Sequence, residues 1–260
     1  MTSTVELQGA LWGADAEGWA VQDELAMPLY EAVAADARIA PGDSVLELGC
    51  ATGCFLQAAA QRGAQITGLD AADTLIELAS RRVPGADLHV GDLQQLPFDD
   101  ESFDVVVGCN VFQFADDVEL GFSEAARVTK RGGRVVVQMW GRPERCELLV
   151  VLGQLRQFLP LPPPGPPGGG NYSDPGVLER LTGAAGLAPA RTGELVTTIE
   201  YPSEEVFLRS TRAAGLVVLA EQLAGSETVV EAIARAAAPF RTDSGTYRFT
   251  NEWHWLVAHR

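Results

Sequence analysis

The sequence predicts an α/β protein built around one sheet. Apolar strand segments alternate with helical segments between residues 45 and 140, and this alternation is typical of a sheet with helices on both faces. The first strand, Val45–Leu48, runs into two glycines, Gly49 and Gly53. A chain of 260 residues that is 47% hydrophobic can bury one substantial core. We therefore expect a single domain over residues 1–260.

Residues 1–40 are compatible with helices, and a Pro-Gly-Asp turn follows them at residues 41–43. We expect this segment to form a helical cap in front of a ligand-binding core at residues 41–142. Two tryptophans of the cap, Trp12 and Trp19, either line a ligand pocket or pack the cap onto the sheet. The sequence leaves both interpretations open.

A tight turn follows the first strand and predicts a nucleotide site. Gly49 and Gly53 let the backbone bend and approach a ligand, and residues 55–61 continue as an Ala-rich helix whose free N–H groups face the same space. The spacing is not the dinucleotide pattern G-x-G-x-x-G, because Ala51 replaces the second glycine and no glycine ends the pattern. We expect Ala51 to adopt an ordinary negative φ, since its methyl group disfavours the left-handed region.

The second predicted strand, residues 65–69, ends at Asp70. Doubly wound folds place a carboxylate at this position, where it accepts hydrogen bonds from ribose hydroxyls. One ligand with a ribose therefore explains both the glycine turn and Asp70.

Four segments, in order along the chain, resemble the motifs of one family. Residues 47–53 read E-x-G-x-x-x-G, residues 91–98 read G-D-L-Q-Q-L-P-F, residues 102–110 form a fourth strand, and residues 131–137 carry a G-G turn and a fifth strand. This order resembles the class I S-adenosylmethionine-dependent methyltransferases, in particular the type 11-like enzymes that act on small molecules. The resemblance implies a Rossmann-like, seven-stranded mixed sheet of order 3-2-1-4-5-7-6 with helices on both faces. The chain departs from the family pattern at Ala51 and at Arg131, where a proline is usual.

By the same resemblance, the turn and the strand ends hold S-adenosylmethionine, and no metal is expected. Glu47 and the turn backbone meet the methionine part, Asp70 takes the ribose hydroxyls, and Asp92 takes the adenine amino group. Asn110 offers its backbone carbonyl near the methionine ammonium. The predicted cofactor-binding residues are Glu47, Gly49, Cys50, Ala51, Gly53, Asp70, Ala71, Asp92, Leu93, Asn110, Val111 and Gln113.

Residues 143–190 are predicted to form an insertion after the fifth strand. One helix begins at Pro143 and runs through Phe158, and the Pro- and Gly-rich residues 160–170 form a loop. A second helix is expected to be capped by residues 173–175 and to end near Gly186.

Residues 191–260 supply the remaining strands and helices. A sixth strand is expected at residues 195–201, helices begin at Ser203 and Ser226, and a long last strand spans residues 247–258. The strand period of two places Trp253 and Trp255 on one face of the last strand and His254 on the other.

Charge and composition limit the classes of partner that we expect the protein to bind. The net charge of −16 opposes binding to a polyanion, so we do not expect a nucleic-acid partner. The four cysteines form no C-x-x-C pair and accompany no histidine cluster, so zinc is not indicated. No segment approaches the ~20 apolar residues of a membrane helix, and no signal peptide is recognised. We expect a soluble cytoplasmic protein with reduced thiols.

The expected activity is methyl transfer to a small, largely apolar metabolite by in-line displacement, which depends mainly on alignment and exclusion of water. The alternatives are a cofactor-binding relative that catalyses a cyclisation or rearrangement, and a nicotinamide-dependent reductase, which the glycine spacing disfavours. His254 is either a general base or a half-buried structural histidine. The residues predicted to line the acceptor site are Trp12, Trp19, Tyr30, Trp140 and Tyr172. The acceptor, the methylated atom and the oligomeric state are not specified by the sequence.

Overall fold

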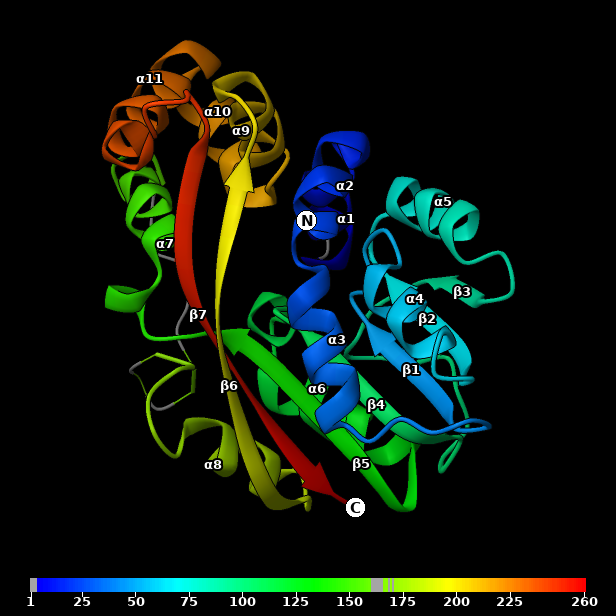
Figure 1. The fold of residues 1–260 in the computed structure, drawn as a ribbon. Helices are drawn as coiled ribbons and strands as arrows, with labels where there is room; N and C mark the ends of the chain where they lie inside the picture. The colour runs from blue at the N-terminus through cyan, green and yellow to red at the C-terminus, as the bar shows by residue number, and fades with distance from the viewer. Residues whose placement is uncertain (1–3, 160–165, 168, 170) are drawn as a thin grey trace.

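The computed structural model describes residues 4–159, 166, 167, 169 and 171–260, and its strands form one mixed sheet (Figure 1). The strand order is β3-β2-β1-β4-β5-β7-β6, which confirms the predicted order. Neighbours from β3 to β5 pair in parallel, whereas β7 pairs antiparallel with both β5 and β6. The strands are β1 (Ser44–Leu48), β2 (Gln65–Asp70), β3 (Asp87–Val90), β4 (Phe103–Cys109), β5 (Thr129–Trp140), β6 (Ala188–Tyr201) and β7 (Tyr247–His259).

Three helices form the expected N-terminal cap: α1 (Thr4–Trp12), α2 (Ala16–Leu25) and α3 (Met27–Asp36). Asp15 caps α2, because its side chain accepts a hydrogen bond from the Gly18 N–H at 2.9 Å. The helices and short turns between the strands of the core are α4 (Cys54–Ala60), α5 (Asp73–Arg82), η1 (Phe112–Phe114) and α6 (Val118–Val128).

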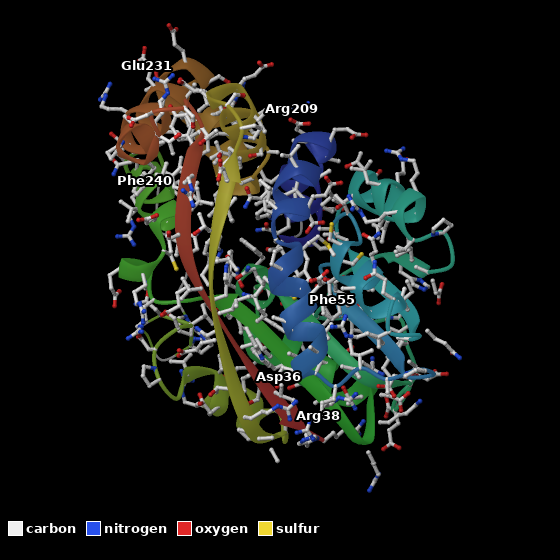
Figure 2. All side chains as sticks on the ribbon, in the orientation of Figure 1. Asp36, Arg38, Phe55, Arg209, Glu231 and Phe240 are labelled. Atoms are coloured by element: carbon white, nitrogen blue, oxygen red, sulfur yellow. The ribbon has the colours of Figure 1, made fainter. Side chains whose placement is uncertain are left out.

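The two faces of the sheet bury different clusters, because successive strand residues point to opposite sides. Val105 and Val107 of β4 lie on the face covered by α3 and α4, which we call the cap face. Phe55 of α4 belongs to this cluster and lies beside α3 (Figure 2). Val106 lies on the opposite face, which we call the far face, with Phe122 of α6.

The last two strands extend beyond the rest of the sheet. Trp253 to His259 of β7 pair with β5, whereas Tyr247 to Glu252 pair with β6 alone. This two-stranded extension carries three helices that we call the helical lobe, α9 (Glu204–Arg212), α10 (Gly215–Ala224) and α11 (Ser226–Ala237), followed by η4 (Ala238–Phe240). Arg209, Glu231 and Phe240 mark the lobe in Figure 2. As expected for a helix start, the Ser203 side chain accepts from the Val206 N–H at 3.2 Å.

The insertion differs from the prediction of a single helix from Pro143 to Phe158. In place of that helix, the chain forms η2 (Pro143–Arg145), α7 (Glu147–Leu152) and η3 (Gly153–Gln157). The break lies at Cys146, whose backbone is extended because it forms a bridge with Asn251 of β7. Buried Glu252 of β7 holds the same segment by ion pairs with Arg142 at 3.1 Å and Arg145 at 2.7 Å.

The second helix of the insertion, α8 (Val177–Ala184), also begins differently from the prediction. The cap predicted at residues 173–175 is wrong, since α8 follows Gly176 in the left-handed region and no side chain caps it. The Asp174 carboxylate instead accepts from the Asn171 N–H at 2.7 Å. Most of the loop predicted at residues 160–170 lies outside the described residues.

Candidate active site

The glycine turn between β1 and α4 is closed by backbone contacts. Gly49 and Gly53 have φ of 67° and 82°, which are values that favour glycine. The Gly49 and Cys50 N–H groups both donate to the Leu69 carbonyl, at 2.7 and 3.1 Å. A Cβ atom on Gly49 would lie 2.5 Å from a methyl group of Val111, so only glycine fits there. The turn thus lies directly against the segment that follows β4.

Ala51 contradicts the expectation of a negative φ, since its φ is 45°. A non-glycine residue in the left-handed region costs about 1–2 kcal/mol. The compensating contact comes from the next strand, because the Ala51 N–H donates to Asp70 Oδ2 at 2.9 Å. The turn therefore keeps the shape of a glycine-rich loop with a methyl group at its centre.

Asp70 ends β2 and is 8% exposed. Its Oδ1 accepts from the Ala72 N–H at 2.9 Å, so each carboxylate oxygen carries one backbone hydrogen bond. Burial raises the pKa of Asp70, although these amide hydrogen bonds oppose the shift. Each oxygen can accept a second hydrogen bond, which suits a pair of ribose hydroxyls. Ala71, the next residue, lies against α1, because a Cβ on Gly9 would clash with its carbonyl.

Glu47 is buried at the end of β1, and no cationic side chain among the described residues forms an ion pair with it. Burial raises its pKa well above the ordinary value, and the nearby carboxylates of Asp23 and Asp70 raise it further. Its Oε2 atom has no hydrogen-bond partner among the described residues. A cationic ligand group such as an ammonium would both pair with this oxygen and offset the repulsion among the carboxylates.

Asp23 of α2 is part of the site and was missed by the sequence analysis. It is 3% exposed. It accepts hydrogen bonds from Thr52 N at 3.1 Å, Thr52 Oγ1 at 2.5 Å and Tyr30 Oη at 2.6 Å. The cap is therefore fastened to the glycine turn by one carboxylate. No local pattern signals this role, since a single acid within a helix is usually solvated.

The remaining predicted cofactor residues lie at the same edge of the sheet. Asp92 Oδ1 accepts from the Gln94 N–H at 2.8 Å, while Leu93 packs against the far-face cluster. Asn110 has a φ of 49°, and its side chain accepts from the Trp140 N–H at 2.9 Å, which ties the ends of β4 and β5 together. The Asn110 carbonyl, expected near a ligand ammonium, accepts from Gln113 Nε2 at 2.8 Å.

The predicted acceptor-site residues fall into three groups. The Trp12 ring lies 4.8 Å from Trp19 and 5.2 Å from Phe114, and it packs under Gly215 of the lobe. Tyr30 packs against the cap-face cluster, as does Trp140. The cap tryptophans therefore join the cap to the core and the lobe.

Tyr172 and His254 lie apart from these aromatic side chains. Tyr172 packs on the far face, and the strand period places His254 on that face too, opposite Trp253 and Trp255. Burial lowers the pKa of His254, whereas Glu194 and a backbone hydrogen bond with Tyr172 act in the opposite direction.

The described residues also bear on metal binding, on membrane insertion and on the position of surface hollows. Within the described ranges, no group of three or more His, Cys, Asp or Glu side chains could hold a metal ion. No helix in the part of the chain that the structure describes is long and apolar enough to span a membrane. A hollow of about 630 Å³ lies between the start of α2 and the lobe, lined by Asp15, Arg209 and Glu221 among others, and none of its lining residues belongs to the glycine turn.

Comparison with known proteins identifies the core. Residues 46–137 match the family described as methyltransferase domain, and this range contains the glycine turn, Asp70 and Asp92. Residues 46–137 thus form a methyltransferase domain of the class I S-adenosylmethionine-dependent type. S-adenosylmethionine is accordingly the cofactor of this domain, and the buried carboxylates with remaining hydrogen-bonding capacity at Asp70 and Glu47 fit its ribose and its ammonium.

The chain is 29% identical to a malonyl-[acyl-carrier protein] O-methyltransferase of Erwinia pyrifoliae, with 83% of this chain and 79% of that protein covered. The protein of the same name from Serratia marcescens is 32% identical, with 37% and 38% covered. The demethylmenaquinone methyltransferase of Renibacterium salmoninarum is 33% identical, with 40% and 44% covered. The match thus spans less than half the length of the latter two relatives.

The fold of the chain is similar to that of the [4+2]-cyclase SpnF, with a TM-score of 0.59 and 19% identity. The similarity covers 90% of this chain and 81% of the cyclase.

Proposed function

We propose that this methyltransferase transfers a methyl group from S-adenosylmethionine to a small, largely apolar acceptor by in-line displacement. The observation that carries the proposal is the placement of two buried carboxylates, Glu47 and Asp70, beside the glycine turn at one edge of the sheet. The cofactor supplies an electrophilic methyl group, so the protein must chiefly align the acceptor and exclude water.

The residues of the core have distinct roles in this proposal. Glu47 and the turn at residues 49–53 hold the methionine part, and Asp70 binds the ribose while Ala71 contacts the adenine. The adenine edge is held by Asp92 and Leu93. Asn110, Val111 and Gln113 border the sulfonium, and Gln113 has a buried Oε1 atom without a partner among the described residues.

The acceptor site is proposed on the cap face, beyond the methyl end of the cofactor. Tyr30 and Trp140 are half-buried there, which provides an apolar, aromatic lining. The net charge of −16 disfavours a polyanionic acceptor. Relatives named for malonyl-[acyl-carrier protein] and demethylmenaquinone act on chemically different acceptors, so neither name defines the substrate of this chain.

A second candidate is a reaction of the bound acceptor without methyl transfer, such as a cyclisation. The similar fold of a [4+2]-cyclase favours keeping this candidate. A nicotinamide-dependent reductase fits less well, because Ala51 interrupts the glycine pattern that such enzymes use.

The decisive experiment is incubation of the purified protein with S-adenosylmethionine labelled at the methyl group and a panel of small metabolites, read by mass spectrometry. We expect the label in one small acceptor together with an equal amount of S-adenosylhomocysteine. Conversion of an acceptor without S-adenosylhomocysteine would favour the cyclisation, and saturable binding of NADH without binding of either cofactor form would contradict the proposal.

A further inference from the structure

A polar side chain outside the predicted cofactor set is buried on the cap face of β5. Gln138 is fully buried, and the register places it between Cys109 of β4 and Trp255 of β7. Its amide Nε2 donates to the Met139 carbonyl at 2.7 Å. The amide nitrogen of Gln138 thus has a partner in the fold, and the amide oxygen is the remaining polar atom of this side chain.

The Gln138 Oε1 atom has no hydrogen-bond partner among the described residues. Burying such an acceptor without a partner costs about 1–3 kcal/mol. A native structure generally keeps an unpaired group of this kind only where water or a ligand satisfies it. Gln138 is therefore a candidate to bind a hydrogen-bond donor that the protein itself does not supply.

Aromatic surface lies next to this amide. Trp140 is two residues further along the same face of β5, and its ring lies 4.2 Å from that of Trp253 at an angle of 32°. The Trp253 N–H is already satisfied by Thr197 Oγ1 at 2.7 Å. Trp140 is only partly buried and therefore offers apolar ring surface, whereas Trp253 is 3% exposed and packs against that ring. Gln138 offers one directional acceptor.

The charge of the surroundings determines which donor fits. Glu47 Oε2, at the end of β1 on the same face, is also unpaired, and Tyr30 of the cap lies near Glu47 and Cys109. A negatively charged acceptor group would direct its lone pairs at the Gln138 amide oxygen, which can only accept a hydrogen bond. A neutral O–H or N–H on a ring satisfies the amide without this repulsion.

We propose that Gln138 Oε1 accepts a hydrogen bond from a neutral O–H or N–H of a planar cyclic acceptor whose ring packs against Trp140. The inference rests on the proposed function, because it assigns the acceptor class and a specificity-determining residue to the same site. Gln138 positions the acceptor and takes no part in breaking the bond between sulfur and the methyl group.

The test uses four small probes and the intact protein saturated with S-adenosylhomocysteine. Phenol carries a ring and a donor, anisole lacks the donor, cyclohexanol lacks the planar ring, and benzoate is charged. Affinities are measured by ligand-observed NMR for the wild type, for Gln138→Met, which keeps the length of the side chain, and for Gln157→Met as a matched control on the exposed η3 turn.

We expect phenol to bind the wild type more tightly than the other three probes do. Gln138→Met is expected to weaken phenol about fivefold, which corresponds to one net hydrogen bond of ~1 kcal/mol, and to leave anisole unchanged. Gln157→Met is expected to change neither. Equal phenol affinity in wild type and Gln138→Met would overturn the role of Gln138, and equal binding of cyclohexanol and phenol would overturn the planar ring.

Binding of S-adenosylhomocysteine, measured by calorimetry on ligand-free samples of the same proteins, separates the two proposals. If the wild type does not bind S-adenosylhomocysteine, the proposed function is wrong. If it binds S-adenosylhomocysteine but does not discriminate among the probes, only the inference on Gln138 is wrong. If Gln138→Met does not fold, Gln138→Asn keeps the amide but withdraws its oxygen by one methylene, and the same selective loss of phenol binding is expected.

Discussion

The two halves of the sheet carry different parts of the proposed site. The parallel half, from β3 to β4, forms the proposed cofactor site with backbone turns and strand-end carboxylates such as Asp70. The antiparallel half, from β5 to β6, presents side chains such as Gln138, Trp140 and Trp253 on a longer surface. Cofactor chemistry is thus encoded by turn geometry, which constrains sequence tightly, whereas acceptor chemistry depends on side chains that can vary without changing the fold.

The strongest test of the parallel half is Asp70→Ala. Loss of two charge-assisted hydrogen bonds to the ribose, worth about 1.5–3 kcal/mol each, predicts at least a ~100-fold weaker affinity for S-adenosylhomocysteine by calorimetry. Asp70→Glu should lose less, because it keeps the carboxylate. Asp73→Ala, an exposed acid at the start of α5, is the matched control and should bind normally. Wild-type affinity in Asp70→Ala would mean that the ribose lies elsewhere.

Asp23→Asn tests whether the cap belongs functionally to the parallel half. The variant weakens three hydrogen bonds that join α2, Tyr30 and Thr52, so we expect about tenfold weaker cofactor binding. Faster hydrogen exchange at residues 49–53 should accompany this loss. Glu17→Gln on the same helix, which alters only the exposed pair with Arg81, should stay within about twofold of wild type. Unchanged exchange at the turn would show that the cap is energetically independent of it.

Ligand binding is expected to change the protonation of Glu47, and this effect is smaller than the losses of affinity expected above. A folded-state pKa raised above the ordinary value of 4.5 means that stability of the ligand-free protein falls as pH rises from about 4.5 towards the folded pKa. A cationic ligand lowers this pKa again, so binding of S-adenosylmethionine should release protons at pH values between the pKa of Glu47 in the bound protein and its pKa in the free protein. Calorimetry in buffers of different ionisation enthalpy measures the release. It should also occur with S-adenosylhomocysteine, which carries the same ammonium, and it should decrease in Glu47→Gln.

His254→Ala should have the smallest effect, because this residue lies on the far face, opposite Trp253. We expect substantial methyl transfer with a true acceptor to remain. A loss in the range of about 10²–10⁴-fold, which is usual for a general base, would place the reacting atom on the far face. The lowered pKa of His254 also predicts that stability declines as pH falls below the ordinary value of 6.5, since the unfolded chain then binds the proton more readily.

The parallel half could be predicted from sequence because its information is local. Apolar strands, the glycine turn and the acid at the end of β2 follow one another within residues 45–70, so their arrangement required no long-range contact. Ala51 shows the limit of this reasoning, since its positive φ depends on a hydrogen bond to Asp70 across the turn.

The antiparallel half and the cap were predicted less completely because distant contacts determine them. The helix expected from Pro143 breaks at Cys146, which bridges to Asn251 near the end of the chain. Asp23 enters the site through Thr52 of the glycine turn. In the sequence, Gln138 is an ordinary polar strand residue, because its neighbours on β4 and β7 come from distant parts of the chain.

The helical lobe has the topology of a very long hairpin loop. The chain leaves β6 at Tyr201 and enters β7 at Tyr247, and these two tyrosines are register partners. Because the two ends of the lobe are adjacent, a different helical segment, or a short turn, can be inserted between them without shifting the register of any strand. The lobe can therefore be replaced as a unit without a change in the sheet, provided that the replacement keeps a surface for Trp12 of the cap, which packs on Gly215.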